Sequence, residues 1–197
     1  MWYRFVQFMF NILFKIIFRF EVIGRENIPL EGPVLIASNH VSLLDPPLVG
    51  TASSRPVNFM AKEELFTFPL GPIYKSLGAF PVKRGASDRH AIKTALGLLK
   101  NNLVLGIFPE GTRSKDGTLG PAEPGALTFA YKTGAAVVPT AVLGSNLAAR
   151  QTFWPKVKVV FGTPLYFTEQ HLDKEEIEEK GRELMKNIGN LLEKNKN

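Results

Sequence analysis

Cysteine is absent from this chain of 197 residues. The protein therefore forms no disulfide, offers no thiolate to a zinc ion and has no cysteine nucleophile. This absence fits a reducing compartment such as the cytoplasm. The composition does not change sharply along the chain, so we expect one domain with a single hydrophobic core.

Common nucleotide-binding and hydrolase motifs are missing as well. No two glycines are spaced as G-x-G and no G-x-x-x-x-G-K-[ST] sequence occurs, so the chain carries neither a dinucleotide fingerprint nor a phosphate loop. The G-x-S-x-G turn of serine hydrolases is also missing, because Ser145 in "LGSNL" lacks the second glycine. The sequence thus offers no nucleophile of the usual acyl-enzyme kind.

Histidine is scarce, with three in the chain. His90 and His171 lie on predicted helices and have no partner at a metal-ligand spacing, so no metal site is predicted. His40 differs, because it follows the apolar run "PVLIAS", where a predicted buried strand gives way to a loop. Strand ends present polar side chains to ligands in α/β domains, which makes His40 a candidate functional residue.

The net charge of +6 favours an anionic partner, such as a nucleic acid, a phosphorylated metabolite, an acidic protein or an anionic membrane. The first twenty residues, "MWYRFVQFMFNILFKIIFRF", indicate the membrane. Their polar residues fall within roughly 120° of a helical wheel; they are Arg4, Gln7, Asn11, Lys15 and Arg19. Residues 1–20 are therefore predicted to form an amphipathic helix in the membrane interface, with its aromatic face toward lipid and Arg4, Lys15 and Arg19 near the headgroups.

Other interpretations of this segment are weaker. A signal peptide needs an uninterrupted apolar middle and a small-residue cleavage site, and a spanning helix would carry Asn11 and Lys15 into hydrocarbon. A helix packed on its own domain is the remaining alternative, although so wide an apolar arc is hard to bury on one domain. We expect a protein held peripherally or monotopically on the cytoplasmic face of a membrane.

Predicted strands and helices alternate along the rest of the chain. Short apolar runs between Gly and Pro signals predict strands at 20–29, 32–39, 57–61, 79–82, 103–108, 135–144 and 156–162. Helical patterns lie between them at 46–54, 63–78, 89–101 and 126–134, and a charged helix follows from Thr168. This order predicts an α/β fold with a mixed, largely parallel sheet flanked by helices.

The stretch "SNHVSLLDPP", residues 38–47, places Asp45 five residues after His40. If the intervening residues make a tight turn, Asp45 can accept a hydrogen bond from one ring nitrogen and leave the other nitrogen to act as a base. The alternative is that His40 merely ends a strand and Asp45 caps the helix that begins at Pro46.

Two further polar clusters also follow short apolar strands. "FPEGTRS", residues 108–114, supplies Glu110, Gly111 and Arg113, and a guanidinium there suits a bidentate contact with phosphate. Lys83 and Arg84 in "VKRG" follow the strand "AFPV". The three clusters are expected to converge on one rim of the sheet.

Together these motifs resemble the glycerolipid acyltransferases, and within them the 1-acylglycerol-3-phosphate acyltransferases. "NHVSLLD" matches the family's N-H-x-x-x-x-D block, and "VKRG", "FPEGTRS" and "VVPTAV" with Pro139 match its other three blocks in order. The blocks span residues 39–142, over half of the chain.

The resemblance implies transfer of a fatty acyl group from an acyl-thioester, on acyl carrier protein or coenzyme A, to the free hydroxyl of a lysophospholipid. It implies that His40 and Asp45 are catalytic. The residues expected to bind the acceptor are Lys83, Arg84, Glu110, Gly111 and Arg113. No cofactor or metal is expected, and the organisation is a membrane-associating helix at 1–20 followed by an acyltransferase domain at 21–197.

Alternatives remain open at this point. Within the same chemistry, the acceptor is glycerol 3-phosphate or another lysophospholipid, although a chain without a large extra N-terminal domain favours lysophosphatidic acid. In another class, the chain is a non-catalytic module that binds anionic lipid, which leaves His40 and Asp45 without a task. A nucleic-acid binder is disfavoured, because the aromatic residues lie on the first helix and in buried runs rather than beside a basic groove.

Overall fold

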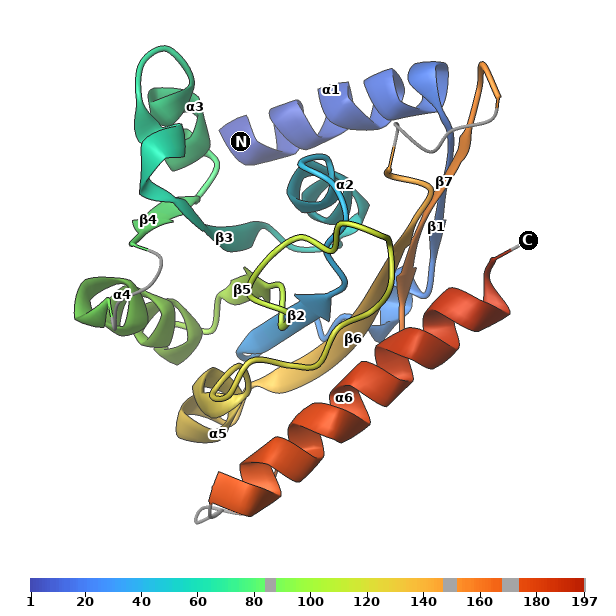
Figure 1. The fold of residues 1–197 in the computed structure, drawn as a ribbon. Helices are drawn as coiled ribbons and strands as arrows, with labels where there is room; N and C mark the ends of the chain where they lie inside the picture. The colour runs from blue at the N-terminus through green and yellow to red at the C-terminus, as the bar shows by residue number, and fades with distance from the viewer. Residues whose placement is uncertain (84–87, 147–151, 168–173, 197) are drawn as a thin grey trace.

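The computed structural model describes residues 1–83, 88–146, 152–167 and 174–196. Within them, seven strands form one sheet in the order β1-β7-β6-β2-β5-β3-β4 (Figure 1). The strands are β1 (Arg19–Ile23), β2 (Val34–Ser38), β3 (Val57–Lys62), β4 (Phe80–Val82), β5 (Val104–Ile107), β6 (Ala136–Leu143) and β7 (Lys156–Phe161). All neighbours pair in parallel except β6 and β7, which confirms the predicted mixed, largely parallel sheet.

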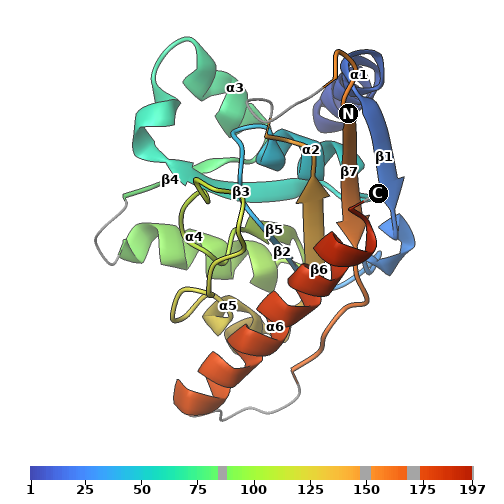
Figure 2. The ribbon, with the colours of Figure 1, turned by 45° about the vertical axis from the view of Figure 1, so that its right-hand side comes forward.

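Helices cover both faces of the sheet (Figures 1 and 2). They are α1 (Trp2–Ile17), α2 (Asp45–Ala52), α3 (Leu70–Ser76), α4 (Arg89–Lys100), α5 (Thr128–Thr133) and α6 (Lys174–Lys194), with short 3-10 helices η1 (Arg25–Asn27) and η2 (Glu63–Phe66). Segment 63–78, predicted as one interrupted helix, is thus η2 followed by α3.

The alternation of side chains along β2 divides the core into two parts. Val34 and Ile36 pack with α1 and α2 on one face, while Leu35 and Ala37 pack with α4, α5 and α6 on the other. Every residue of β2 and β5 is buried. This burial agrees with their continuous apolar sequences, which are typical of strands covered on both faces. The carboxyl ends of these two strands therefore emerge from a rigid centre.

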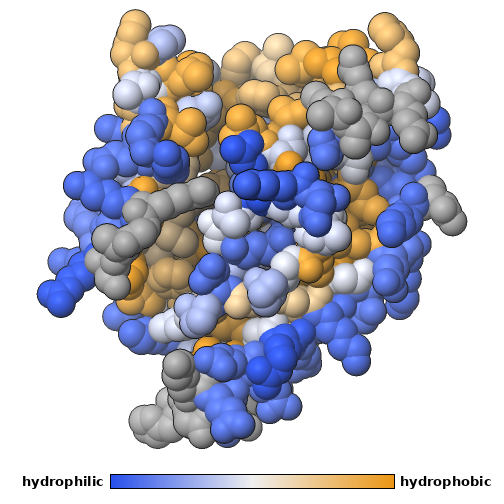
Figure 3. All heavy atoms as spheres, viewed as in Figure 1, coloured by the Kyte–Doolittle hydropathy of each residue, from blue (hydrophilic) through white to orange (hydrophobic). Residues whose placement is uncertain are grey.

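Helix α1 ends at Ile17, and Arg19 already belongs to β1, so the helix is shorter than the predicted 1–20. One side of it joins the core through Phe14, which is 3% exposed. The Gln7 side chain donates to carbonyl oxygens at the end of α2, and Arg4 donates to the Ser54 carbonyl. Part of the polar stripe therefore faces the protein, while a broad apolar face stays outside along the upper edge of Figure 3.

None of the helices within the described residues is both long and apolar enough to cross a membrane.

Candidate active site

The site lies where β2 ends. Asn39 follows the strand, and its side-chain amide donates to the Val142 carbonyl at 3.0 Å while its Oδ1 accepts the Val142 N–H at 2.8 Å. These two bonds tie the start of the loop to β6, the next strand of the sheet. His40 therefore leaves the sheet at a defined position and direction.

His40 and Asp45 form the predicted pair. His40 Nδ1 lies 2.9 Å from Asp45 Oδ2, and the same oxygen accepts the N–H groups of Val41 and Ser42 at 2.7 Å each. His40 is 7% exposed and Asp45 is fully buried. A carboxylate at Nδ1 favours the tautomer in which Nδ1 carries the proton, so Nε2 is left to accept one.

The alternative role of Asp45 as a helix cap is wrong. Asp45 is the first residue of α2, whose N-terminus has no side-chain cap, and its carboxylate turns back to the loop instead. Pro46 and Pro47 follow at helix positions that need no N–H donor. The prolines, the turn and the carboxylate together hold the imidazole in one orientation.

The segment "FPEGTRS" contacts His40 in three ways. The Phe108 ring stacks on the imidazole with centroids 3.9 Å apart and an interplanar angle of 17°. The Ser114 N–H donates to the His40 carbonyl at 2.8 Å. Glu110 Oε1 accepts the His40 N–H at 2.9 Å. The imidazole, the backbone N–H and the backbone carbonyl of His40 are therefore all contacted by this one segment.

Glu110 also holds its own loop. Its Oε2 accepts the Gly120 N–H at 3.0 Å, and the side chain is 8% exposed. Both carboxylate oxygens thus accept backbone N–H groups, one from His40 after β2 and one from Gly120 in the loop that carries Glu110. The predicted contact between Glu110 and the acceptor stays a prediction, and the structure gives this side chain a positioning task.

Gly111 has a left-handed backbone with φ of 67°. A Cβ at this position would lie 2.8 Å from Cγ of Glu123, so both the conformation and the space require glycine. This turn redirects the chain between Glu110 and Arg113.

The cationic residues are less tightly assembled. Arg113 is exposed in the loop that contacts His40. Lys83 follows β4, and its Nζ is 4.0 Å from Glu63 Oε2. Strands β3 and β5 separate β4 from β2, so at about 4.8 Å per strand Lys83 starts roughly 14 Å across the sheet from His40. Strand β4 is half-buried at the sheet's edge rather than buried, and Arg84 lies outside the described residues.

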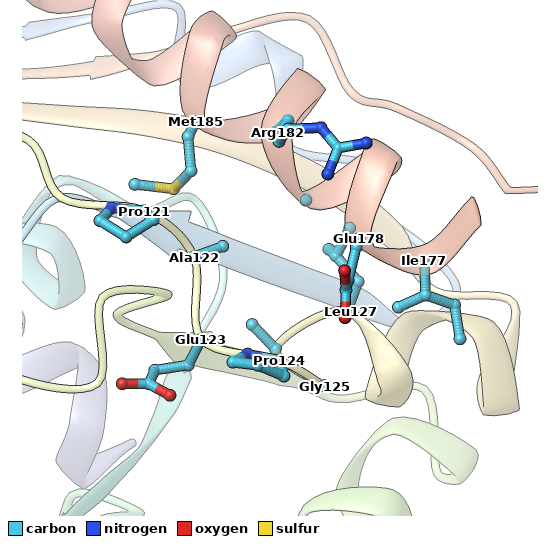
Figure 4. A pocket seen from close by; sticks show the side chains of 12 residues that line it. Pro121, Ala122, Glu123, Pro124, Gly125, Leu127, Ile177, Glu178, Arg182 and Met185 are labelled. Carbon is cyan, nitrogen blue, oxygen red and sulfur yellow. The ribbon is translucent and has the colours of Figure 1, made fainter. Parts of the chain in front are cut away.

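The loop after Glu110 has its own polar anchor in Asp116. The hydroxyl and N–H of Thr118 and the hydroxyl of Ser114 donate to its carboxylate and lower the pKa of Asp116 from 3.8 to about 2. A hollow of about 400 Å³ lies beside this loop, lined by Glu110, Thr112, Ser114 and their neighbours. A second hollow of about 440 Å³ lies between residues 121–127 and α6 (Figure 4). Neither His40 nor Asp45 is among the residues that line this second hollow.

The family model described as Acyltransferase matches residues 19–143, which contain His40, Asp45 and the whole of "FPEGTRS". This chain belongs to the acyltransferase family. The match covers more than half of the chain and begins at β1.

Named relatives agree with this membership. The acyltransferase is 31% identical over 166 residues to the 1-acyl-sn-glycerol-3-phosphate acyltransferase of Bacillus subtilis, covering 83% of this chain and 82% of the relative. It is 38% identical over 135 residues to the chloroplastic enzyme LPAT1 of Arabidopsis thaliana, covering 66% of this chain but only 37% of that longer protein.

A solved structure shares the fold. The crystal structure of the 1-acyl-sn-glycerophosphate acyltransferase PlsC from Thermotoga maritima matches with a TM-score of 0.70 and 30% identity. The match covers 87% of this acyltransferase and 71% of that chain.

Proposed function

We propose that this acyltransferase transfers a fatty acyl group from an acyl-thioester to the free hydroxyl of 1-acylglycerol 3-phosphate, giving phosphatidic acid. The observation that carries the proposal is the buried His40–Asp45 pair, 2.9 Å apart, at the carboxyl edge of the sheet. Relatives named for this reaction support the choice of acceptor. The donor carrier is acyl carrier protein or coenzyme A.

The chemistry follows from the orientation of the imidazole. His40 Nε2 takes the proton of the acceptor hydroxyl as its oxygen attacks the thioester carbonyl carbon, and Asp45 stabilises the resulting imidazolium. When the tetrahedral intermediate collapses, the C–S bond breaks and the imidazolium returns the proton to the thiolate. One ester and one thiol are formed, so no covalent enzyme intermediate, cofactor or metal is needed.

The acceptor phosphate is bound by cationic side chains at the rim. Arg113 is the best placed among the described residues, because its loop contacts His40 directly through Ser114. A guanidinium can hold two phosphate oxygens at once. Lys83 and Arg84 complete the acceptor site in this proposal, and Gly111 lets the backbone turn beneath it.

Membrane attachment brings the acyltransferase to its lipid substrates. The outward face of α1 is apolar and aromatic, and residues 1–20 contain no acidic side chain. A helix of this kind lies in the interface of an anionic leaflet rather than across it. The protein is then peripheral or monotopic on the cytoplasmic face.

The proposal is tested with purified protein, lipid vesicles, a labelled acyl-thioester and either 1-acylglycerol 3-phosphate or glycerol 3-phosphate. We expect labelled phosphatidic acid with the first acceptor and at least tenfold less product with the second. Preference for glycerol 3-phosphate would overturn the acceptor assignment, and acylation of neither would overturn the function. Separate reactions with acyl carrier protein and coenzyme A thioesters assign the donor.

A further inference from the structure

Exposed large apolar side chains gather in three segments that are far apart in the chain. They are Trp2, Phe5, Phe8, Met9, Ile12, Leu13, Ile16 and Ile17 on α1, Leu65, Phe68, Leu70 and Ile73 on η2, α3 and the turn between them, and Phe153 and Trp154 before β7. Each is at least 40% exposed. We call this set of residues the outer apolar surface. It includes exposed side chains from two segments besides α1.

The sheet topology places all three segments at one edge. η2 and α3 follow the carboxyl end of β3, which runs parallel to β5 and β2. The segment before β7 lies beyond the carboxyl end of β6, and α1 precedes β1, which runs antiparallel to β2 through the β6–β7 pair. His40 follows the carboxyl end of β2, so the outer apolar surface and the catalytic pair share this edge.

Helix α1 connects the other two segments. At its start, Trp2 Nε1 donates to Ser76 Oγ of α3 at 3.0 Å. Beyond its end, the Arg19 N–H donates to the carbonyl of Pro155, the residue after Trp154, at 3.0 Å. Figure 1 shows α1 running along the top of the molecule from α3 to the turn before β7, and Figure 3 shows hydrophobic residues along that edge.

The charges beside this surface are complementary to an anionic membrane. Exposed cations border it at Arg4, Lys15, Arg19 and Lys75. Within the part of the chain that the structure describes, none of these four has a carboxylate within 4.0 Å, whereas nearby Glu63 and Glu64 are paired with Lys83 and Lys62. Uncompensated positive charge around an apolar face matches anionic headgroups around acyl chains.

We propose that the outer apolar surface docks as a unit on an anionic lipid bilayer, with η2–α3 and the Phe153–Trp154 segment in contact with lipid together with α1. This deepens the proposed function, on which it rests for the choice of a bilayer as the occupant. Three contacts fix the orientation of the molecule, which a single helix lying in the interface does not. The edge that carries His40 then faces the leaflet that holds the acceptor.

The two tryptophans of the chain provide a direct test, because one lies on α1 and the other before β7. The Trp2→Phe variant leaves Trp154 as the only tryptophan, and Trp154→Phe leaves Trp2. Each is mixed with phosphatidylglycerol vesicles whose acyl chains are brominated near the headgroup, without any acyl-thioester. We expect quenching and a blue shift for both reporters. Quenching of Trp2 without quenching of Trp154 would overturn docking by the whole surface.

The α3 contact is tested with Phe68→Asp, whose side chain is 90% exposed and contributes little to folding. Leu30→Asp is the matched control, because Leu30 is 79% exposed and precedes β2 at the opposite edge. In vesicle co-sedimentation we expect Phe68→Asp to weaken binding about tenfold or more and Leu30→Asp to leave it unchanged. Ile73→Asp serves as a second variant if circular dichroism shows that Phe68→Asp does not fold.

Equal binding by folded Phe68→Asp or Ile73→Asp and wild type would overturn the proposal. So would a self-associated wild-type protein that Phe68→Asp makes monomeric while vesicle binding stays unchanged, because a second copy would then cover the surface. Binding is measured without substrate and does not depend on turnover. Vesicle binding without acylation would therefore remove the proposed function and keep the docking surface. Acylation by wild type together with equal vesicle binding by wild type and folded Phe68→Asp would keep the function and remove the docking surface.

Discussion

Replacing Glu110 by glutamine distinguishes a positioning role from an acceptor contact. Glu110 Oε1 accepts the N–H of His40 and Oε2 accepts the N–H of Gly120, at 2.9 and 3.0 Å. Glutamine keeps the size of the side chain but has one oxygen. One of the two N–H groups would therefore face an amide NH₂ that cannot accept its hydrogen bond.

The magnitude follows from this geometry. A hydrogen bond to a charged acceptor contributes about 1.5–3 kcal/mol, so Glu110→Gln should lower the free energy of unfolding by about that amount. For a domain of this size the melting temperature should fall by roughly 3–12 °C. Because the His40 peptide is released, the imidazole shifts, and a displacement of about 1 Å is expected to reduce kcat by about 10²-fold.

Thermal unfolding and steady-state kinetics at varied acceptor concentration measure both effects. The control is Glu123→Gln, which makes the same chemical change at an exposed position of the same loop and should leave the melting temperature unchanged. A Glu110→Gln protein that melts like wild type and shows only a raised KM for the acceptor would refute the positioning role. That result would favour the contact predicted from the family resemblance.

Asp45→Asn keeps an oxygen that can accept the N–H groups of the turn but loses the carboxylate beside His40 Nδ1. We therefore expect kcat to fall about 10²- to 10⁴-fold with a small change in melting temperature, and near-normal turnover would contradict the role of the pair. A Cβ at Gly106 would overlap the Phe59 ring, so Gly106→Ala should lower the free energy of unfolding, measured with urea, by about 1–3 kcal/mol. An unchanged urea midpoint would show that the ring moves aside without cost. The pKa of Asp116 is lowered to about 2 in the folded loop, so its contribution to stability is present above about pH 4 and lost as the pH falls through 2. The protection of the Thr118 amide against hydrogen exchange, taken relative to its intrinsic exchange rate at each pH, should therefore fall over that range, and equal protection at pH 5 and pH 2 would contradict this.

The centre of the fold was predictable because its signals are local. Apolar runs such as "PVLIAS" and "LVLGIF" have the length and composition of strands covered on both faces, and both became buried strands. The end of the first helix was not predictable in this way. Phe18 and Phe20 continue its apolar pattern into β1, because the same residue types serve a helix face and a strand.

The His40–Asp45 pair was predictable because its residues lie five positions apart beside two prolines. The role of Glu110 in holding His40 was not, since its partners are backbone N–H groups that no side-chain pattern reveals. Phe108 was overlooked for a related reason, because an aromatic residue after a strand is typical of any core. Gly106 was the one sequence signal for this packing, because its missing side chain leaves room for the Phe59 ring that stacks on Phe108.

The central claim is that His40 removes the proton from the acceptor hydroxyl. The most direct measurement is the turnover of His40→Ala with labelled acyl-thioester and 1-acylglycerol 3-phosphate in vesicles, alongside vesicle binding of the same protein. We predict a loss of at least 10²-fold in kcat with unchanged binding. A His40→Ala protein that binds vesicles and forms phosphatidic acid at close to the wild-type rate would contradict the account.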